Sequence, residues 1–249
     1  MIRHIVFCSA LLLTFFSVGS IHVIGADSAG TRVLKLDKTE TDDAGLKKIT
    51  AAYPNLAELT LSETKITDAG IAALKTLTKL RKIRLAKTKI TDAAAKTLAE
   101  IPTLEDIDVS QTEFGDSGLA ELKPLKNLKR LNLYTTKITD SGLAVLKNFQ
   151  SVKTLVWLNI DKCDLTDAAV PAILPLEKLA WIHFGRTKLT DAGLNRLTSL
   201  KTLKEISVTN TNVTSAGIEK FKKAMPDCKV NENTGNAAGS EVIVPSPAA

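Results

Sequence analysis

The chain has 249 residues, with 33 Lys and Arg against 27 Asp and Glu, and a formal net charge of +6. This mild excess of positive charge permits an anionic partner but does not require one. Aromatic residues make up only 4% of the chain, and its three cysteines are widely spaced. The cysteine spacing matches no zinc or redox motif, so no chemistry of that kind is expected.

Residues 1–26 have the pattern of a secretory signal. Arg3 supplies a positive charge, residues 5–18 are almost wholly apolar, and small residues lead up to Ala26, where we expect cleavage. The apolar region extended to Ile24 approaches the roughly 20 residues that span a bilayer, so an uncleaved N-terminal anchor is the alternative. In both cases the rest of the chain is predicted to be extracytoplasmic, secreted or periplasmic, and membrane association is expected only without cleavage.

The block from Leu59 to Leu74, L-T-L-S-E-T-K-I-T-D-A-G-I-A-A-L, recurs along most of the chain. Residues 131–146 and 182–197 repeat it almost position by position. Its first apolar residue recurs in steps of 25, 24, 24, 24, 27, 24 and 24 residues, at Leu34, Leu59, Ile83, Ile107, Leu131, Leu158, Ile182 and Ile206. A fixed period in the twenties with an L-x-x-L-x-L core predicts a leucine-rich-repeat solenoid.

Each unit is predicted to begin with a short strand, because Leu59 and Leu61 alternate with polar residues. A threonine follows in almost every unit, and we expect this column to point inward, where its hydroxyl satisfies backbone groups of the turn. The Thr column consists of Thr39, Thr64, Thr88, Thr112, Thr136, Cys163, Thr187 and Thr211. We predict that Cys163 is a small buried filler in this column rather than half of a disulfide.

An acidic residue precedes the predicted helix of most units. Asp is a preferred N-cap residue, so we expect this Asp column to cap the helices. It consists of Asp68, Asp92, Asp116, Asp140, Asp167 and Asp191, with Ser215 in the last unit. The helix, of about two turns, carries Ile71, Leu74 and Leu77 inward, and it is stable only when packed on the strands.

About eight such units over residues 33–231 predict an α/β solenoid, with a parallel β-sheet on the concave face and short helices on the convex face. Residues 232–249 hold Gly, Ala, Ser and Pro without a period, so we expect a disordered tail. Between Leu131 and Leu158 the spacing is three residues longer than the usual step. Insertions in repeat proteins map to loops, which predicts a bulge just before Trp157.

The unit resembles the cysteine-containing variety of leucine-rich repeat, L-x-x-C-x-x-I-T-D-x-G-L-x-x-L. Here Thr replaces that Cys almost everywhere, and Cys163 is the exception. The resemblance covers about residues 33–231 and implies the fold without implying a ligand. Relatives of this variety often follow an F-box in ubiquitin-ligase adaptors, but the residues before the first unit are too few for an F-box. The near-identical units also resemble exported repeat proteins of environmental bacteria.

The alternation also predicts which side chains lie on the concave face, where strands about 4.8 Å apart bring equivalent positions into contact. The run Glu58, Lys82, Asp106 and Arg130 alternates in sign, which predicts lateral pairing of charges. The only two tryptophans of the chain are adjacent on this face, and both are expected to be exposed. With their neighbours they form the candidate ligand-binding site, Trp157, Trp181, Tyr134, Arg130 and His183.

Other interpretations of these residues stay open. The two tryptophans can instead stack on each other and only cover the sheet. His183 with Asp161 or Asp108 suggests acid–base or metal chemistry, but the pattern positions no third partner, so no catalytic residue, metal or cofactor is predicted. A calcium ladder along the Asp column is a remote alternative. Two acidic residues, Glu113 and Asp164, interrupt the lysines that follow the strands, so no nucleic acid partner is predicted; these lysines are Lys65, Lys89, Lys137 and Lys188.

Together these patterns predict a non-enzymatic, exported scaffold that binds a protein or a cell-envelope ligand on its concave face. Two alternatives follow from the same sequence. The simplicity of the repeats suits a structural protein of the envelope without a discrete ligand. The resemblance leaves an F-box-type adaptor as a further option, and the sequence sets no oligomeric state.

Overall fold

The computed structural model describes residues 22–24 and 32–232. Over these residues, ten strands form one sheet in chain order. β1 (His22–Ile24) pairs antiparallel with β2 (Val33–Lys35), and each later strand joins its predecessor in parallel. The later strands are β3 (Glu58–Thr60), β4 (Lys82–Arg84), β5 (Asp106–Asp108), β6 (Arg130–Asn132), β7 (Trp157–Asn159), β8 (Trp181–His183), β9 (Glu205–Ser207) and β10 (Lys229–Asn231).

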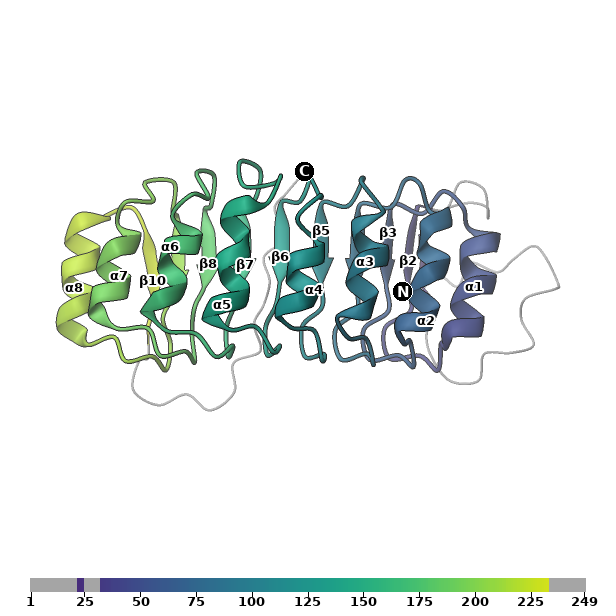
Figure 1. Ribbon diagram of the computed structural model, residues 1–249, viewed down its shortest axis with the longest axis horizontal. Helices are drawn as coiled ribbons and strands as arrows, with labels where there is room; N and C mark the ends of the chain where they lie inside the picture. The colour runs from purple at the N-terminus through teal and green to yellow at the C-terminus, as the bar shows by residue number, and fades with distance from the viewer. Residues whose placement is uncertain (1–21, 25–31, 233–249) are drawn as a thin grey trace, which may run out of the picture.

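Short helices connect the strands and cover one face of the sheet (Figure 1). The α-helices are α1 (Asp43–Ala52), α2 (Asp68–Ile71), α3 (Ala93–Ala99), α4 (Asp116–Glu121), α5 (Asp140–Leu143), α6 (Val170–Ile173), α7 (Asp191–Leu197) and α8 (Ser215–Ala224). Three 3-10 turns extend them, η1 (Ala72–Thr76), η2 (Ala144–Asn148) and η3 (Asp167–Ala169). None of the helices in the described residues is long and apolar enough to cross a membrane. We call the covered side the helical face and the opposite side, which the sequence predicts to be concave, the sheet face.

The described residues overlap the predicted signal peptide at one end of the chain and stop near the start of the predicted tail at the other. β1 lies within residues 1–26, the range assigned to a signal peptide, so a cut after Ala26 would remove this strand. The rest of that range, and residues 233–249 of the predicted tail, lie outside the described residues. The repeats themselves run from β2 to β10, and their leucines and isoleucines form one continuous core between sheet and helices.

The Thr column points inward, as predicted. The hydroxyl of Thr64 donates to the carbonyl of Leu61 at 2.6 Å, and the same bond to the carbonyl three residues earlier recurs along the column. Cys163 is buried and unbonded to another cysteine, and its thiol donates to the carbonyl of Leu133 at 3.1 Å. The prediction of a small buried filler is therefore confirmed.

A left-handed residue precedes each member of the Thr column, with φ between 52° and 59°, and none of these residues is glycine. This conformation costs about 1–2 kcal/mol for a residue with a Cβ. Parallel pairing compensates for it, because the backbone N–H of Glu63, for example, donates to the carbonyl of Ala86 in the next unit at 2.8 Å. The sequence pattern did not reveal this column: Lys38, Glu63, Lys87, Gln111, Thr135, Lys162, Arg186 and Asn210.

The prediction that the Asp column caps the helices is wrong for every member except Asp92, which stands at the N-cap of α3 but makes no side-chain capping bond. The N-cap of α2 is Thr67, whose hydroxyl accepts from the backbone N–H of Ala69 at 3.3 Å. The aspartate beside the cap is the first helical residue, and its carboxylate reaches the next unit. Asp43 thus accepts from the backbone N–H and the hydroxyl of Thr67, at 2.9 and 2.6 Å. This Asp–Thr ladder continues as Asp68 to Thr91, Asp116 to Thr139, Asp140 to Thr166, Asp167 to Thr190 and Asp191 to Thr214.

The glycine of the T-D-x-G motif makes room for this ladder. A Cβ at Gly142 would collide with the carboxylate of Asp116, and the same holds at the equivalent glycines of four other units. Where alanine takes this place, the helix starts differently. The unit with Ala94 begins α3 only after Asp92, and the unit with Ala169 begins with the 3-10 turn η3. The aspartate and the glycine of the motif therefore encode a contact between units, whereas its threonine caps the helix of its own unit.

The predicted bulge is present between η2 and β7, where the loop reaches beyond its neighbours (Figure 1). The loop is held by packing and by hydrogen bonds. Phe149, Ser151 and Leu155 are buried, and the hydroxyl of Thr154 donates to the carbonyl of Leu128 in the preceding unit at 2.9 Å. The insertion is therefore an ordered part of the rim beside β7.

Candidate functional site

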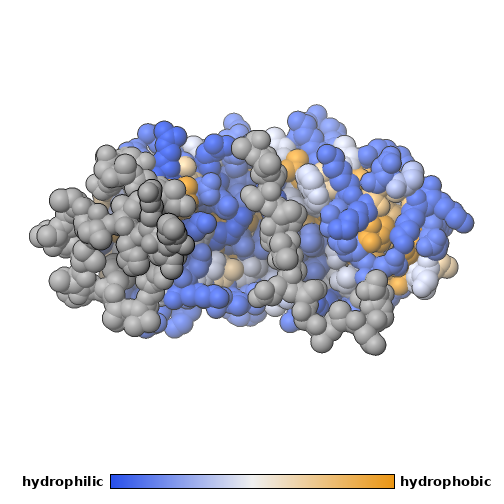
Figure 2. All heavy atoms as spheres, turned by 180° about the vertical axis from the view of Figure 1, so that it is seen from behind, coloured by the Kyte–Doolittle hydropathy of each residue, from blue (hydrophilic) through white to orange (hydrophobic). Residues whose placement is uncertain are grey.

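Strand register places the predicted site residues on adjacent strands of the sheet face. Arg130 on β6 pairs in register with Trp157 on β7, which pairs with Trp181 on β8. His183 lies two residues after Trp181 on the same strand and so shares its face. Viewed from the sheet side, hydrophilic residues prevail on the surface, with hydrophobic patches between them (Figure 2).

Trp157 is buried, with 4% of its surface exposed, so the prediction that both tryptophans are exposed is wrong for this residue. The guanidinium carbon of Arg130 lies 4.5 Å from the centroid of the indole, and the ring of His183 lies 5.5 Å away at a tilt of 50°. The close spacing of the strands brings these neighbours over the ring. Arg130, Trp157 and His183 therefore form a packed cluster, which we call the indole stack.

Trp181 is half-buried and keeps part of its ring accessible, with the ammonium of Lys204 5.6 Å from the ring centroid. The ring contacts described for Trp157 are with Arg130 and His183, so the alternative of two tryptophans stacked on each other is not what the structure shows. Trp181 is thus the accessible aromatic surface beside the indole stack.

Tyr134 does not join the indole stack in the described contacts. It is half-buried beyond the end of β6, and its backbone N–H donates to the side-chain oxygen of Asn132 at 3.2 Å. The alternation places it on the correct face but four residues after Arg130, beyond the end of the strand. It remains a predicted ligand contact at the edge of the candidate ligand-binding site.

Sequence reasoning missed the most tightly paired charge on this face. The guanidinium of Arg84 donates to both carboxylate oxygens of Asp106 at 2.7 Å, across the diagonal between β4 and β5, and its Nε lies 3.9 Å from Asp108. The predicted lateral pairing is present but looser, with Lys82 and Glu58 3.4 Å apart and Arg130 and Asp106 3.4 Å apart. The signal in the sequence was that Arg84 lies two residues after Lys82 on the same face, and so lies diagonally opposite Asp106.

The two arginines of the face carry opposite pKa shifts. Burial lowers the pKa of Arg84, but the hydrogen bonds and charge of Asp106 outweigh it, so the pKa lies above its ordinary value. Burial also lowers the pKa of Arg130, and there Asp106 does not make up the difference, partly because the charge of Arg84 opposes it. The charge of Arg130 is therefore the less well compensated of the two.

Asp161 and His183 lie near each other on this face and interact electrostatically. Asp161 is buried and accepts a hydrogen bond from the backbone N–H of Gly185, and Arg186 lies 3.9 Å from its carboxylate. Burial raises the pKa of Asp161 against the charge of His183, and burial lowers the pKa of His183 against the charges of Asp161 and Glu205. Within the described residues no group of three His, Cys, Asp or Glu side chains is placed to hold a metal ion.

Three of the four lysines beyond the strands form ion pairs with the preceding unit. Lys65 lies 2.5 Å from Glu40, Lys137 contacts Glu113, and Lys188 lies 2.7 Å from Asp164. These side chains are exposed, so each pair contributes little to stability. Alternating charges of this kind offer no continuous basic stripe to a polyanion.

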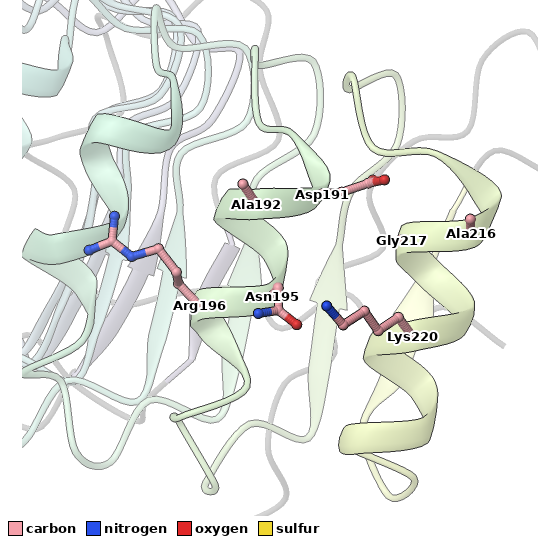
Figure 3. Close-up of a pocket in the computed structure, with 7 residues that line it drawn as sticks. All are labelled: Asp191, Ala192, Asn195, Arg196, Ala216, Gly217 and Lys220. Atoms are coloured by element: carbon pink, nitrogen blue, oxygen red, sulfur yellow. The ribbon is translucent and has the colours of Figure 1, made fainter.

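A shallow hollow lies on the helical face between α7 and α8 (Figure 3). Asn195 from α7 and Lys220 from α8 point toward each other beside a volume of about 560 Å³, whereas the side chain of Arg196 points away from α8. Asp191 at its upper end is already engaged by Thr214 in the Asp–Thr ladder. The hollow therefore arises from the ordinary groove between two units.

Comparison with known proteins identifies one family and a similar solved structure. A family described as Leucine Rich repeat matches residues 100–123, one unit of the sheet and helix pattern. The protein is a leucine-rich-repeat solenoid. Among solved structures it is similar to internalin C2 from Listeria monocytogenes, with 23% identity and a TM-score of 0.59 over 81% of this chain and 80% of that one. At this identity the likeness shows the fold alone, and no curated protein matches the chain in sequence.

Proposed function

We propose that this leucine-rich-repeat protein is a non-enzymatic, exported scaffold that binds a protein partner through its sheet face. The observation that carries the proposal is the indole stack with Trp181 beside it. The buried core, the Thr column and the Asp–Thr ladder recur from unit to unit, whereas this grouping of two tryptophans with Arg130 and His183 occurs at one place on the sheet face. Trp, Tyr and Arg are the residues in which binding energy concentrates at protein interfaces.

Export rests on the sequence pattern of residues 1–26. No cofactor enters the proposal, because a scaffold of this kind needs none. A cell-envelope ligand other than a protein, and a structural protein without a discrete ligand, are the competing outcomes of the experiment.

Cross-linking from matched positions on the two faces tests the proposal. A photoreactive phenylalanine analogue replaces Trp181 on the sheet face in one variant and Asn195 on the helical face in the other. In the source cell, we expect one defined protein adduct from position 181 and none from position 195. Adducts from position 195 alone would place the interface on the helical face. An absence of adducts from both would favour the structural repeat protein.

A further inference from the structure

We propose that Arg130 is a receptor for a carboxylate, presented as an acidic side chain by the protein partner that docks beside Trp181. This inference rests on the proposed function and names the chemistry of its anchor. The contacts of Arg130, and their difference from those of Arg84, carry it.

The guanidinium of Arg130 is held in place but not fully bonded. It stacks over the indole of Trp157 at 4.5 Å, and only 14% of its side chain is exposed. Its Nε lies 3.4 Å from Asp106, which is an ion pair at the limit of a hydrogen bond. Its terminal nitrogens donate no hydrogen bond to the described residues, although a guanidinium carries five N–H donors.

Arg84 shows what a satisfied arginine looks like on the same face. With 19% of its side chain exposed it is buried to a similar degree, yet it donates to both oxygens of Asp106 at 2.7 Å. Because Asp106 gives its two oxygens to Arg84, it offers Arg130 only a loose contact. The shared carboxylate therefore leaves one of the two arginines short of an acceptor.

A buried cation with unused donors is unfavourable in the free protein, and a partner that supplies an acceptor relieves this. The ring of Trp157 packs against the guanidinium and restricts its motion, so less conformational entropy remains to be lost on binding. The fork of a planar guanidinium matches the two oxygens of a carboxylate. Arg130 is thus organised for this contact before the partner arrives.

The surroundings favour a carboxylate over a phosphate group. Asp106 and Asp108 lie within the same charge cluster as Arg84 and Arg130, and their two negative charges offset the two arginines. A dianionic phosphate would gain no net attraction from this balanced cluster, whereas one carboxylate needs only the free edge of Arg130. Trp181 is half-buried on the neighbouring strand and would receive the apolar part of the same partner segment.

The probe is a matched pair of small molecules, N-acetylglutamate N-methylamide and its glutamine analogue, titrated into the full chain. Binding is followed by the ¹H–¹⁵N NMR signals of the Trp157 indole and the Arg130 side chain. We expect saturable shifts with the glutamate probe at an affinity at least about tenfold higher than with the glutamine probe. Arg130→Gln should abolish them. Arg130→Lys keeps the charge but loses the fork, and it should weaken binding by about tenfold.

Arg81→Gln is the matched control for the loss of one positive charge, because Arg81 is bonded to both oxygens of Glu105 and its side chain is exposed. We expect this variant to bind the glutamate probe as the parent does. Arg130→Gln leaves Asp106 paired with Arg84, and a urea unfolding midpoint close to that of the parent verifies that its fold persists.

Four outcomes would overturn the inference: equal binding of the two probes, equal loss in the Arg81→Gln variant, equally tight binding of inorganic phosphate, or no response up to about 100 mM glutamate probe. The proposed function is tested independently of the carboxylate receptor. A partner cross-linked from position 181 that binds the Arg130→Gln variant unchanged would leave the scaffold in place and remove only the carboxylate receptor.

Discussion

The Asp–Thr ladder and the indole stack are built from the same repeat frame but differ in what they repeat. In the ladder, one carboxylate per unit accepts two hydrogen bonds from the next unit, at nearly constant distances from Asp43 to Thr214. In the stack, Arg130 and Trp157 occupy equivalent positions of neighbouring strands and His183 lies two residues further along the frame, and this combination of side chains occurs at one place in the described residues. A contact that recurs in unit after unit serves the stacking of units, so the positions that break the pattern are where a ligand contact is expected.

The largest expected difference in stability is between alanine substitutions of the two tryptophans in the candidate ligand-binding site. Trp157→Ala should lower the free energy of unfolding by about 3–5 kcal/mol, because it removes a buried ring that packs against Arg130 and His183. Trp181→Ala should cost about 1 kcal/mol or less, because the ring is only half-buried. Urea unfolding followed by circular dichroism measures both. Equal losses would contradict the burial that separates the two rings.

The ladder should break at its glycine. We expect Gly142→Ala to cost about 1–3 kcal/mol, because the added methyl group collides with the carboxylate of Asp116. The loss should shrink when the same change is made in an Asp116→Ala background, where the carboxylate is absent. A double-mutant cycle of urea unfolding midpoints measures this coupling.

Ala94→Gly is the control for the glycine exchange, because its unit already accommodates alanine at the equivalent position. Only the loss of helix propensity is expected there, about 1 kcal/mol or less. If the Gly142→Ala loss persisted without Asp116, the contact between units would not be the reason for the glycine.

Lowering the pH should destabilise the indole stack at a higher pH than it destabilises the Asp–Thr ladder. Burial lowers the pKa of His183 in the folded protein, so the unfolded chain binds that proton more readily. The free energy of unfolding should therefore fall as the pH drops below 6.5, the ordinary value for histidine. Urea midpoints across this range should show the fall in the parent and less of it in His183→Gln.

Asp161 has the opposite sign, because its raised pKa makes the folded protein the better proton acceptor and acidification below that pKa stabilises it. Asp161→Asn should therefore steepen the loss on the acid side. A parent protein whose stability rises on acidification from neutral pH would show that Asp161 rather than His183 governs the cluster.

The smallest effect is expected where the repeat pattern is restored. Cys163→Thr should change the free energy of unfolding by less than about 0.5 kcal/mol, because threonine already fills the equivalent buried positions and bonds the turn carbonyl. Thermal unfolding of the two proteins under reducing conditions is the measurement. A loss well beyond this range would mean that the contact of the thiol with Leu133 is specific to this unit.

Much of the architecture is visible in the sequence because it repeats. The spacing of the leucines and isoleucines predicts the strands, their parallel order, the inward Thr column and the bulge before Trp157. Each of these depends on residues near one another in the chain and on a period that counts the units. The T-D-x-G motif is equally visible, but its role was mistaken, because Asp43 bonds Thr67 of the next unit rather than its own helix.

The sequence by itself determined which residues share the sheet face and which rows they form, because the alternation and the period are local properties of the chain. Only the tertiary structure decided that Trp157 is buried, that Arg84 takes both oxygens of Asp106, and that Arg130 is left with free donors. The physical reason is that Arg84, Arg130 and Trp157 are long side chains on closely spaced strands. The two arginines compete for the carboxylate of Asp106, and Arg130 also packs on the ring of Trp157. Register brings such side chains together, but their rotamers and their competition for one carboxylate are settled only when all the strands are packed.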